Sequence, residues 1–179
     1  DAYQSALSWV TERTESISRS QQYRKAIDEF PKLTKSLRTQ LENFNLEPDA
    51  PSANLSIAEL EQLSIQTSSQ LFELSRQLQQ EQERSREINN SLTQLPLQLA
   101  STRKSLGDAE QRLPSQSNAN TPLSQAKLTQ LQAEISFYKA KIDELELEQL
   151  SASNRQEISR LQAELLKNNQ SKTDKLLQL

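Results

Sequence analysis

The stretch SIAELEQLSIQTSSQLFELSRQLQQEQERSREINNSLTQLPLQLASTRKSLGDAEQRL (residues 56–113) decides the fold. Every third or fourth residue, taken in strict alternation from Leu60, falls on one narrow line, and eleven of these sixteen residues are apolar. This spacing places a thin apolar seam along one helix and is typical of a coiled coil. The positions are Leu60, Ser64, Thr67, Leu71, Leu74, Leu78, Glu81, Ser85, Ile88, Leu92, Leu95, Leu99, Thr102, Leu106, Ala109 and Leu113.

The start of this helix has a signal of its own. Ser56 followed by Glu59 forms a capping box, in which each side chain satisfies a backbone N–H of the first turn. Around Glu81 and Ser85 the seam becomes polar, and we expect that stretch to be loose and solvated. So long a helix with so thin a seam needs partner helices, because most helical stability in proteins comes from packing an apolar face.

Two further helices are expected, at about 2–44 and 122–178, joined to the first by linkers at 45–55 and 114–121. Proline, asparagine and serine residues in both linkers stop helix growth and turn the chain. Thr121 is expected to cap the last helix, with Pro122 at its first position, where the missing N–H costs nothing. The single tryptophan, Trp9, is interpreted as packing at a helix crossing.

Apolar spacing also predicts which face each flanking helix buries. The first helix has two seams, offset by about one residue, with Pro31 within the second. The last helix has one unbroken seam followed by a displaced stripe. The predicted positions are Tyr3, Leu7, Val10, Thr14 and Ile17; Tyr23, Ile27, Phe30, Thr34, Leu37, Leu41 and Phe44; Leu128, Leu131, Ile135, Tyr138, Ile142 and Leu145; and Leu150, Ile158, Leu161 and Leu165.

Short linkers between long helices favour antiparallel neighbours. The expected fold class is therefore all-α: an elongated antiparallel coiled coil, or bundle of three long helices, forming a single domain over residues 1–179. Pro31 and Pro96 each remove a backbone donor, so we expect kinks there, or a short break near 29–31. One valine and one glycine in 179 residues argue against sheets and tight hairpins.

Charge is spread evenly, and the net charge is only −3. Residues 1–50 hold 7 basic and 8 acidic side chains, residues 51–120 hold 6 and 8, and residues 121–179 hold 8 and 8. Without a cluster of Lys and Arg, we expect no nucleic-acid partner. No apolar run approaches the length that crosses a bilayer, so we expect no membrane contact by these residues. The chain holds no methionine, so we expect a processed product or a fragment without a signal peptide.

The residue types offer little for catalysis. The absence of His and Cys excludes the usual zinc sites and nucleophile–base pairs, and a single glycine excludes a glycine-rich phosphate loop. One acidic cluster is present, and we interpret it as a solvated helix face with lysines nearby. We therefore expect no catalytic, cofactor-binding or metal-binding residue, no cofactor and no enzyme activity. The cluster is Asp143, Glu144, Glu146 and Glu148, and the nearby bases are Lys139 and Lys141.

Specific strings carry more information than periodicity, and three of them hold prolines. They are QY at 22–23, ID at 27–28, FPKL at 30–33, SQL at 69–71, SRQ at 75–77, QQEQERSREI at 79–88, SLTQLP at 91–96, NTPL at 120–123, DELEL at 143–147 and QLSASNRQE at 149–157. Together they resemble the N-terminal periplasmic region of the large mechanosensitive channels of Gram-negative bacteria, which are members of the small-conductance mechanosensitive channel family. The similarity covers nearly the whole chain.

The resemblance implies an inner-membrane parent that carries this helical region in the periplasm and opens under membrane tension during hypo-osmotic shock. It implies assembly with other subunits of the same channel as a homo-heptamer, with envelope components as further partners. The family's pore and gating residues lie outside these 179 positions, so this region would have a modulatory or assembly role. The alternative is a coiled-coil scaffold or adaptor of the bacterial cell envelope, since leucine seams alone fit both classes.

Overall fold

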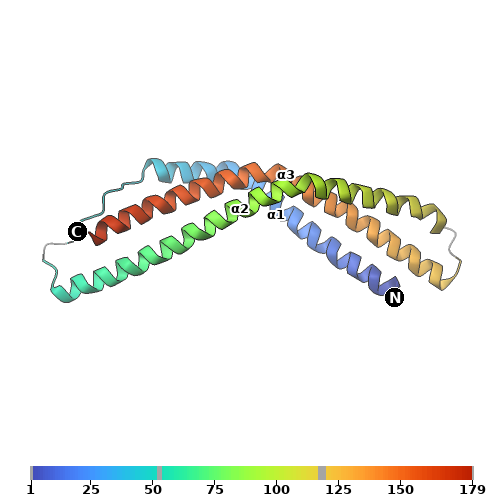
Figure 1. Ribbon diagram of the computed structural model, residues 1–179, viewed down its shortest axis with the longest axis horizontal. Helices are drawn as coiled ribbons and strands as arrows, with labels where there is room; N and C mark the ends of the chain where they lie inside the picture. The colour runs from blue at the N-terminus through green and yellow to red at the C-terminus, as the bar shows by residue number, and fades with distance from the viewer. Residues whose placement is uncertain (1, 52–53, 117–119, 179) are drawn as a thin grey trace. The chain divides into compact units, whose positions relative to one another are not determined.

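The computed structural model describes residues 2–51, 54–116 and 120–178, and over these residues it consists of three long helices without a strand (Figure 1). Helix α1 spans Ala2–Glu42, α2 spans Ile57–Gln116 and α3 spans Pro122–Leu177. The expected all-α bundle is confirmed. Over the described residues, no helix combines the length and the hydropathy that a membrane span requires.

The helices build two compact units, and each unit contains a part of every helix. Unit 1 comprises Asp1–Asp28 and Asn90–Ser153, and unit 2 comprises Glu29–Asn89 and Asn154–Leu179. Within each unit, side chains of α3 bond to both α1 and α2. The single domain expected over residues 1–179 stays a prediction.

Both predicted helix starts are confirmed. The backbone N–H and the Oγ of Ser56 donate to Glu59 Oε2, at 2.8 and 2.7 Å, and the N–H of Glu59 donates back to Ser56 Oγ at 3.4 Å. At α3, the N–H of Ser124 donates to Thr121 Oγ1 at 3.1 Å, just before Pro122 in the first turn. Local side chains therefore satisfy the backbone donors that a helix start leaves open.

From Thr67 onward, the seam predicted along α2 is the face that α2 buries; its first two positions, Leu60 and Ser64, are exposed. The fully buried residues among its described side chains all lie on that seam: Thr67, Ile88, Leu95, Leu99 and Ala109. In unit 1, Leu95 and Leu99 form one apolar cluster with Leu145 of α3, and Ala109 forms a second with Leu131. The contact between α2 and α3 thus provides the apolar core of unit 1.

The seam predicted for the first half of α1 is wrong. Its large apolar residues Leu7, Val10 and Ile17 are exposed. The face that α1 buries carries small side chains instead, which allow two helices to approach closely because the interaxial distance depends on the side chains at the contact. The fully buried residues in this half are Ala6, Ser16 and Ser20. The second seam, from Tyr23 to Phe44, is confirmed, since each of its positions is buried or partly buried.

Trp9 anchors the small-residue face of α1 to α3. Its ring centroid lies 5.1 Å from that of Phe137 and 5.6 Å from that of Tyr138, and both ring pairs are tilted. Aromatic pairs in tilted arrangements stabilise a fold by more than the burial of their apolar area alone would. The interpretation of Trp9 as packing at a helix contact is confirmed.

The first seam of α3 is confirmed, because all six of its positions are buried or partly buried. The prediction of a displaced stripe after this seam is wrong at Leu150, which is exposed. The next two residues, Ser151 and Ala152, are fully buried instead. The reason is that α3 contacts α1 as well as α2, so its buried face is wider than one seam and extends over small residues. Ile158, Leu161 and Leu165 are buried or partly buried, as predicted.

The prolines do not interrupt the helices. Pro31 lies inside α1, and Pro96 and Pro114 lie inside α2, so the short break expected near 29–31 does not occur. All three prolines are exposed, so their rings do not disturb the packing between helices. A kink at Pro31 or Pro96 stays a prediction.

Unit 2 has a more polar interior than unit 1. Its fully buried residues include Thr34, Thr67, Ser159 and Thr173 beside Ile88 and Leu161. The stretch around Glu81 is expected to be loose and solvated, and most of its side chains are indeed exposed. Glu81 is an exception: Ser159 Oγ donates to Glu81 Oε2 at 3.0 Å, and the carboxylate pairs with Arg84 at 2.7 Å. The polar heptad of α2 therefore has polar partners on α3.

Replacement of the buried Leu95 by alanine should lower the free energy of unfolding by about 2–5 kcal/mol, because it removes transfer free energy and leaves a cavity. Leu97 is the matched control: it is 76% exposed, whereas Leu95 is 1% exposed. Leu97→Ala should therefore change stability by no more than about 0.5 kcal/mol. Urea unfolding followed by circular dichroism measures both variants, and equal losses would contradict the assigned seam.

Candidate functional site

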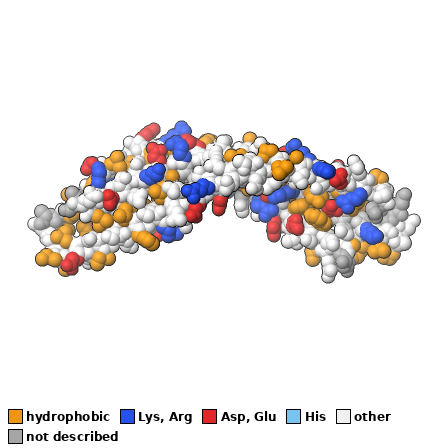
Figure 2. All heavy atoms as spheres, viewed as in Figure 1, with side chains coloured by type: hydrophobic (Ala, Val, Ile, Leu, Met, Phe, Trp, Pro, Cys, Tyr) orange, Lys and Arg blue, Asp and Glu red, His pale blue; other side chains and the backbone are white. Residues whose placement is uncertain are grey.

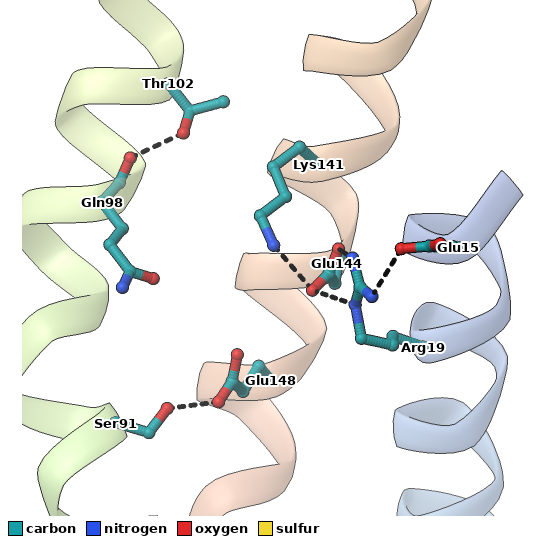
Figure 3. A network of polar contacts seen from close by, with 8 residues as sticks. All are labelled: Glu15, Arg19, Ser91, Gln98, Thr102, Lys141, Glu144 and Glu148. Atoms are coloured by element: carbon teal, nitrogen blue, oxygen red, sulfur yellow. Dashed lines mark hydrogen bonds and ion pairs between the residues drawn. The ribbon is translucent and has the colours of Figure 1, made fainter. Parts of the chain in front are cut away.

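The acidic cluster of α3 is the strongest candidate site in the sequence, and the structure divides it between two neighbouring helices. Figure 3 shows Glu144 directed toward α1, with Glu148 one turn further along α3 and directed toward α2. Asp143 and Glu144 bond to α1, whereas Glu146 and Glu148 bond to α2. The four carboxylates therefore do not converge on one point.

Glu144 lies in the contact between α1 and α3 in unit 1, and its side chain is only 3% exposed. Arg19 Nε of α1 donates to Glu144 Oε1 at 2.8 Å, and Arg19 Nη2 lies 3.4 Å from Oε2. Lys141 Nζ, one turn earlier on α3, donates to Oε1 at 2.8 Å. Arg19 also pairs with Glu15, with 3.6 Å between Nη1 and Oε2 (Figure 3). One buried carboxylate is thus held by two cations.

Two opposing effects set the pKa of Glu144. Burial is the largest single effect and raises the pKa, because it disfavours the charged form, but the hydrogen bonds of the neighbouring side chains, first Arg19 and then Lys141, together with the charge of Lys141 lower it by more in total. The net result is a pKa below the ordinary value, so the carboxylate is ionised at neutral pH. A charge in this position contributes to stability only while both its partners remain in place.

The other three acidic residues make more exposed contacts. Arg24 Nη2 donates to both oxygens of Asp143 at 3.1 Å, and Arg103 Nη2 of α2 donates to Glu146 Oε1 at 2.6 Å. Ser91 Oγ of α2 donates to Glu148 Oε1. Polar contacts from one short stretch of α3 therefore reach both neighbouring helices of unit 1.

The interpretation of this cluster as a solvated face is wrong for Glu144, which is buried. The lysines also differ from expectation: Lys141 pairs with the cluster, but Lys139 pairs with Glu110 of α2 at 3.1 Å. Among the described residues, no group of three or more acidic side chains could hold a metal ion. The cluster thus joins α3 to both α1 and α2. The absence of a catalytic, cofactor-binding or metal-binding role stays a prediction.

Arg19 is the residue of this site that sequence reasoning missed. It lies 125 positions from Glu144 in the chain, and no local spacing connects the two. The available signal was indirect: Ser16 and Ser20 place small residues on the face of α1 that carries Arg19, as a face that packs closely would require. An arginine within a row of small residues is therefore a candidate for an interhelical ion pair.

Further ion pairs join the helices within each unit. In unit 1, Arg112 of α2 pairs with Glu134 of α3 at 2.8 Å, and in unit 2, Arg38 of α1 pairs with Glu157 of α3 at 3.1 Å. Figure 2 shows that basic and acidic side chains are intermingled on the visible face rather than separated by sign. Several of the charged side chains thus match one helix with another, while others pair within a helix.

Comparison with known proteins gives a family. The chain matches the family described as the mechanosensitive ion channel porin domain over residues 1–179. It is 48% identical over 175 residues to the miniconductance mechanosensitive channel MscM of Escherichia coli (strain K12). That match covers 98% of the chain and 16% of the relative, so the chain spans about a sixth of that protein's length. No solved structure matches the chain significantly. The resemblance to the large mechanosensitive channels is confirmed, and this family is a channel family rather than an enzyme class.

Glu144→Gln should lower the free energy of unfolding by about 1.5–3 kcal/mol, because Arg19 and Lys141 lose a charged acceptor. Glu146→Gln is the control, since the Glu146 and Arg103 side chains are 52% and 59% exposed and solvent screens their pair. That variant should lose about 0–1 kcal/mol. Urea denaturation measures both variants, and a loss for Glu144→Gln no larger than for Glu146→Gln would show that the buried pair does not hold the helices.

Stability should fall as the pH falls below the ordinary glutamate range. The folded-state pKa of Glu144 is lowered, and hydrogen bonds from Arg160 and then Arg38 lower the pKa of Glu157 to about 2. Because the unfolded chain binds these protons first, the stability that the two carboxylates contribute is present above pH 5 or so and is lost progressively toward about pH 2. Thermal midpoints measured between about pH 7 and 3 test this, and the fall should be smaller in Glu144→Gln. A flat profile would contradict it.

Proposed function

This chain belongs to the family of mechanosensitive ion channel porin domains, and on that premise we propose that it is the periplasmic helical domain of a channel that opens on membrane tension in hypo-osmotic shock. Within that channel its role is modulation of gating or assembly of subunits. Its partners are other copies of the same chain in a homo-heptamer, and components of the cell envelope. The pore is formed by parts of the parent outside residues 1–179.

One observation carries the proposal: the similarity to the miniconductance channel extends along 98% of the chain at 48% identity. Coiled-coil periodicity by itself produces short matches of low complexity. This match instead includes the linkers and the proline-bearing strings, whose residues no leucine seam requires.

The fold suits a modulatory role in a specific sense. A domain outside a pore changes the opening equilibrium only if its interaction free energy differs between the closed and open states. Helices that are joined along their length by buried seams and by ion pairs such as Arg19–Glu144 and Arg112–Glu134 hold their surfaces in fixed positions within a unit. Contacts made by such surfaces would break or form as a whole when neighbouring subunits move.

Patch-clamp recording of the parent with and without residues 1–179, in cells that lack other such channels, tests the proposal. The deleted form should keep a pressure-gated conductance of unchanged size, because no pore residue is removed, while its threshold or kinetics should shift, because the contacts of the domain are lost.

Membrane insertion of both forms, verified by fractionation, is the necessary control. A deleted form that inserts and conducts nothing under pressure would show that the domain is essential rather than modulatory. An intact parent that inserts and shows no pressure-gated conductance would overturn the channel function and favour a coiled-coil scaffold or adaptor of the envelope.

A further inference from the structure

An apolar stripe on α1 faces outward from unit 1. It consists of Leu7, Val10, Thr14 and Ile17, which follow the alternating spacing of four and three residues that a coiled-coil seam requires. Leu7 is 66% exposed, and Val10 and Ile17 are exposed as well. Thr14 Oγ1 donates to the carbonyl of Val10 at 2.9 Å, so its hydroxyl is already bonded within the helix. This stripe has the geometry to receive another helix.

A second outward face lies on α2 in the same unit. Thr93, Leu97, Ala100, Lys104 and Gly107 have the same alternation of four and three residues. Leu95 and Leu99 of the seam face α3, and at 100° per residue Leu97 points to the opposite side of α2. Leu97 is 76% exposed, and Ala100 is exposed too. The second face is therefore short, weakly apolar and turned away from α3.

Gly107 is an independent observation on this second face. It is the single glycine of the chain, and a glycine inside a helix is destabilising relative to alanine. A Cβ built on Gly107 would meet no atom within 4 Å, so packing within the chain does not require a glycine here. Close approach of a helix from outside does require a small residue, and Ala100 provides another one, two turns earlier.

The two faces lie on the helices that flank α3. In unit 1, α3 contacts α1 through Glu144 and α2 through Leu145, and Figure 1 shows α3 running between these two helices. A stripe on one flank and a small-residue face on the other can be joined only between different molecules. Pairing of two unlike faces repeats head to tail and can close into a ring, which is the rule for cyclic assemblies.

The size of the faces indicates how such a contact could be stable. A standard interface uses about 20–30 residues a side, far more than either face offers, so a free partner from solution would not be held firmly. Copies anchored in one assembly have a high effective concentration, and a small contact then suffices.

We propose that the α1 stripe of one copy packs against the α2 face around Leu97, Ala100 and Gly107 of the neighbouring copy. This inference rests on the proposed function, which supplies the assembly of identical chains. The partner is thus a second copy of this chain, and the contact is between unlike surfaces.

Cysteine cross-linking in the full-length parent tests the contact, and residues 1–179 contain no native cysteine. One form of the parent carries Leu7→Cys, a second carries Lys104→Cys, other cysteines are replaced by serine, and the two forms are co-expressed with different tags. A short bismaleimide should link the two forms to each other and should link neither form to itself. Gly107→Leu, whose Cβ would meet no atom of the chain within 4 Å, should abolish most of this linkage without lowering the thermal midpoint, because a glycine inside a helix is itself destabilising.

Ser8→Cys paired with Lys104→Cys is the matched control, because Ser8 is exposed next to Leu7 but points about 100° away from it. The fraction of the Ser8 pair that becomes linked should be at least about tenfold lower than that of the Leu7 pair, because the assembly holds only the α1 stripe close to the neighbouring α2 face. Equal linkage from Ser8, linkage of the Leu7→Cys form to itself, or no linkage in an assembled parent would each overturn the contact and leave the proposed function standing. A parent that does not assemble, as measured by its mass in detergent, would overturn both.

Discussion

The carboxylate of Glu144 is buried between two helices, and this burial constrains the rest of unit 1. Removing an ionised carboxylate from water costs several kcal/mol or so unless opposite charges and hydrogen bonds replace the lost hydration. Arg19 and Lys141 provide that replacement. Helix α1 must therefore present Arg19 to α3, and this requirement fixes the rotation of α1 about its own axis. Ser16 and Ser20, which share that face, become buried as a consequence.

The same constraint explains which parts of the fold the sequence could predict. The seam of α2 and the caps at Ser56 and Thr121 follow from local spacing, because each depends on residues within one or two turns. They needed no knowledge of the neighbouring helices. The buried face of α1 depends on an ion pair across 125 positions, and periodicity contains no information at that distance. Leu7, Val10 and Ile17 form a regular seam in the sequence, yet the rotation set by Arg19 turns them outward.

The candidate site was predictable only as a cluster. The four acidic residues of α3 could be identified from composition and position, but their roles depend on which neighbour each of them meets. Glu144 and Asp143 meet arginines of α1, and Glu146 meets an arginine of α2. Such partners become visible only when the helices are packed, so the sequence could not separate a solvated face from an interhelical clamp.

The two contacts of α3 in unit 1 differ in chemistry, and this difference divides their roles. The contact with α2 is made by Leu95, Leu99 and Leu145. Apolar side chains of this kind stabilise the contact, but many apolar residues of similar volume could replace them, so they specify the orientation of the helix only weakly. The contact with α1 is made by small residues, aromatic rings and one buried charge, which tolerate few alternative arrangements. Stability and orientation thus come from opposite sides of α3. A helix that is oriented by charge rather than by its leucines keeps its apolar stripe available for a contact outside the chain, whereas α2, which packs through Leu95 and Leu99, leaves only the short, weakly apolar face around Leu97.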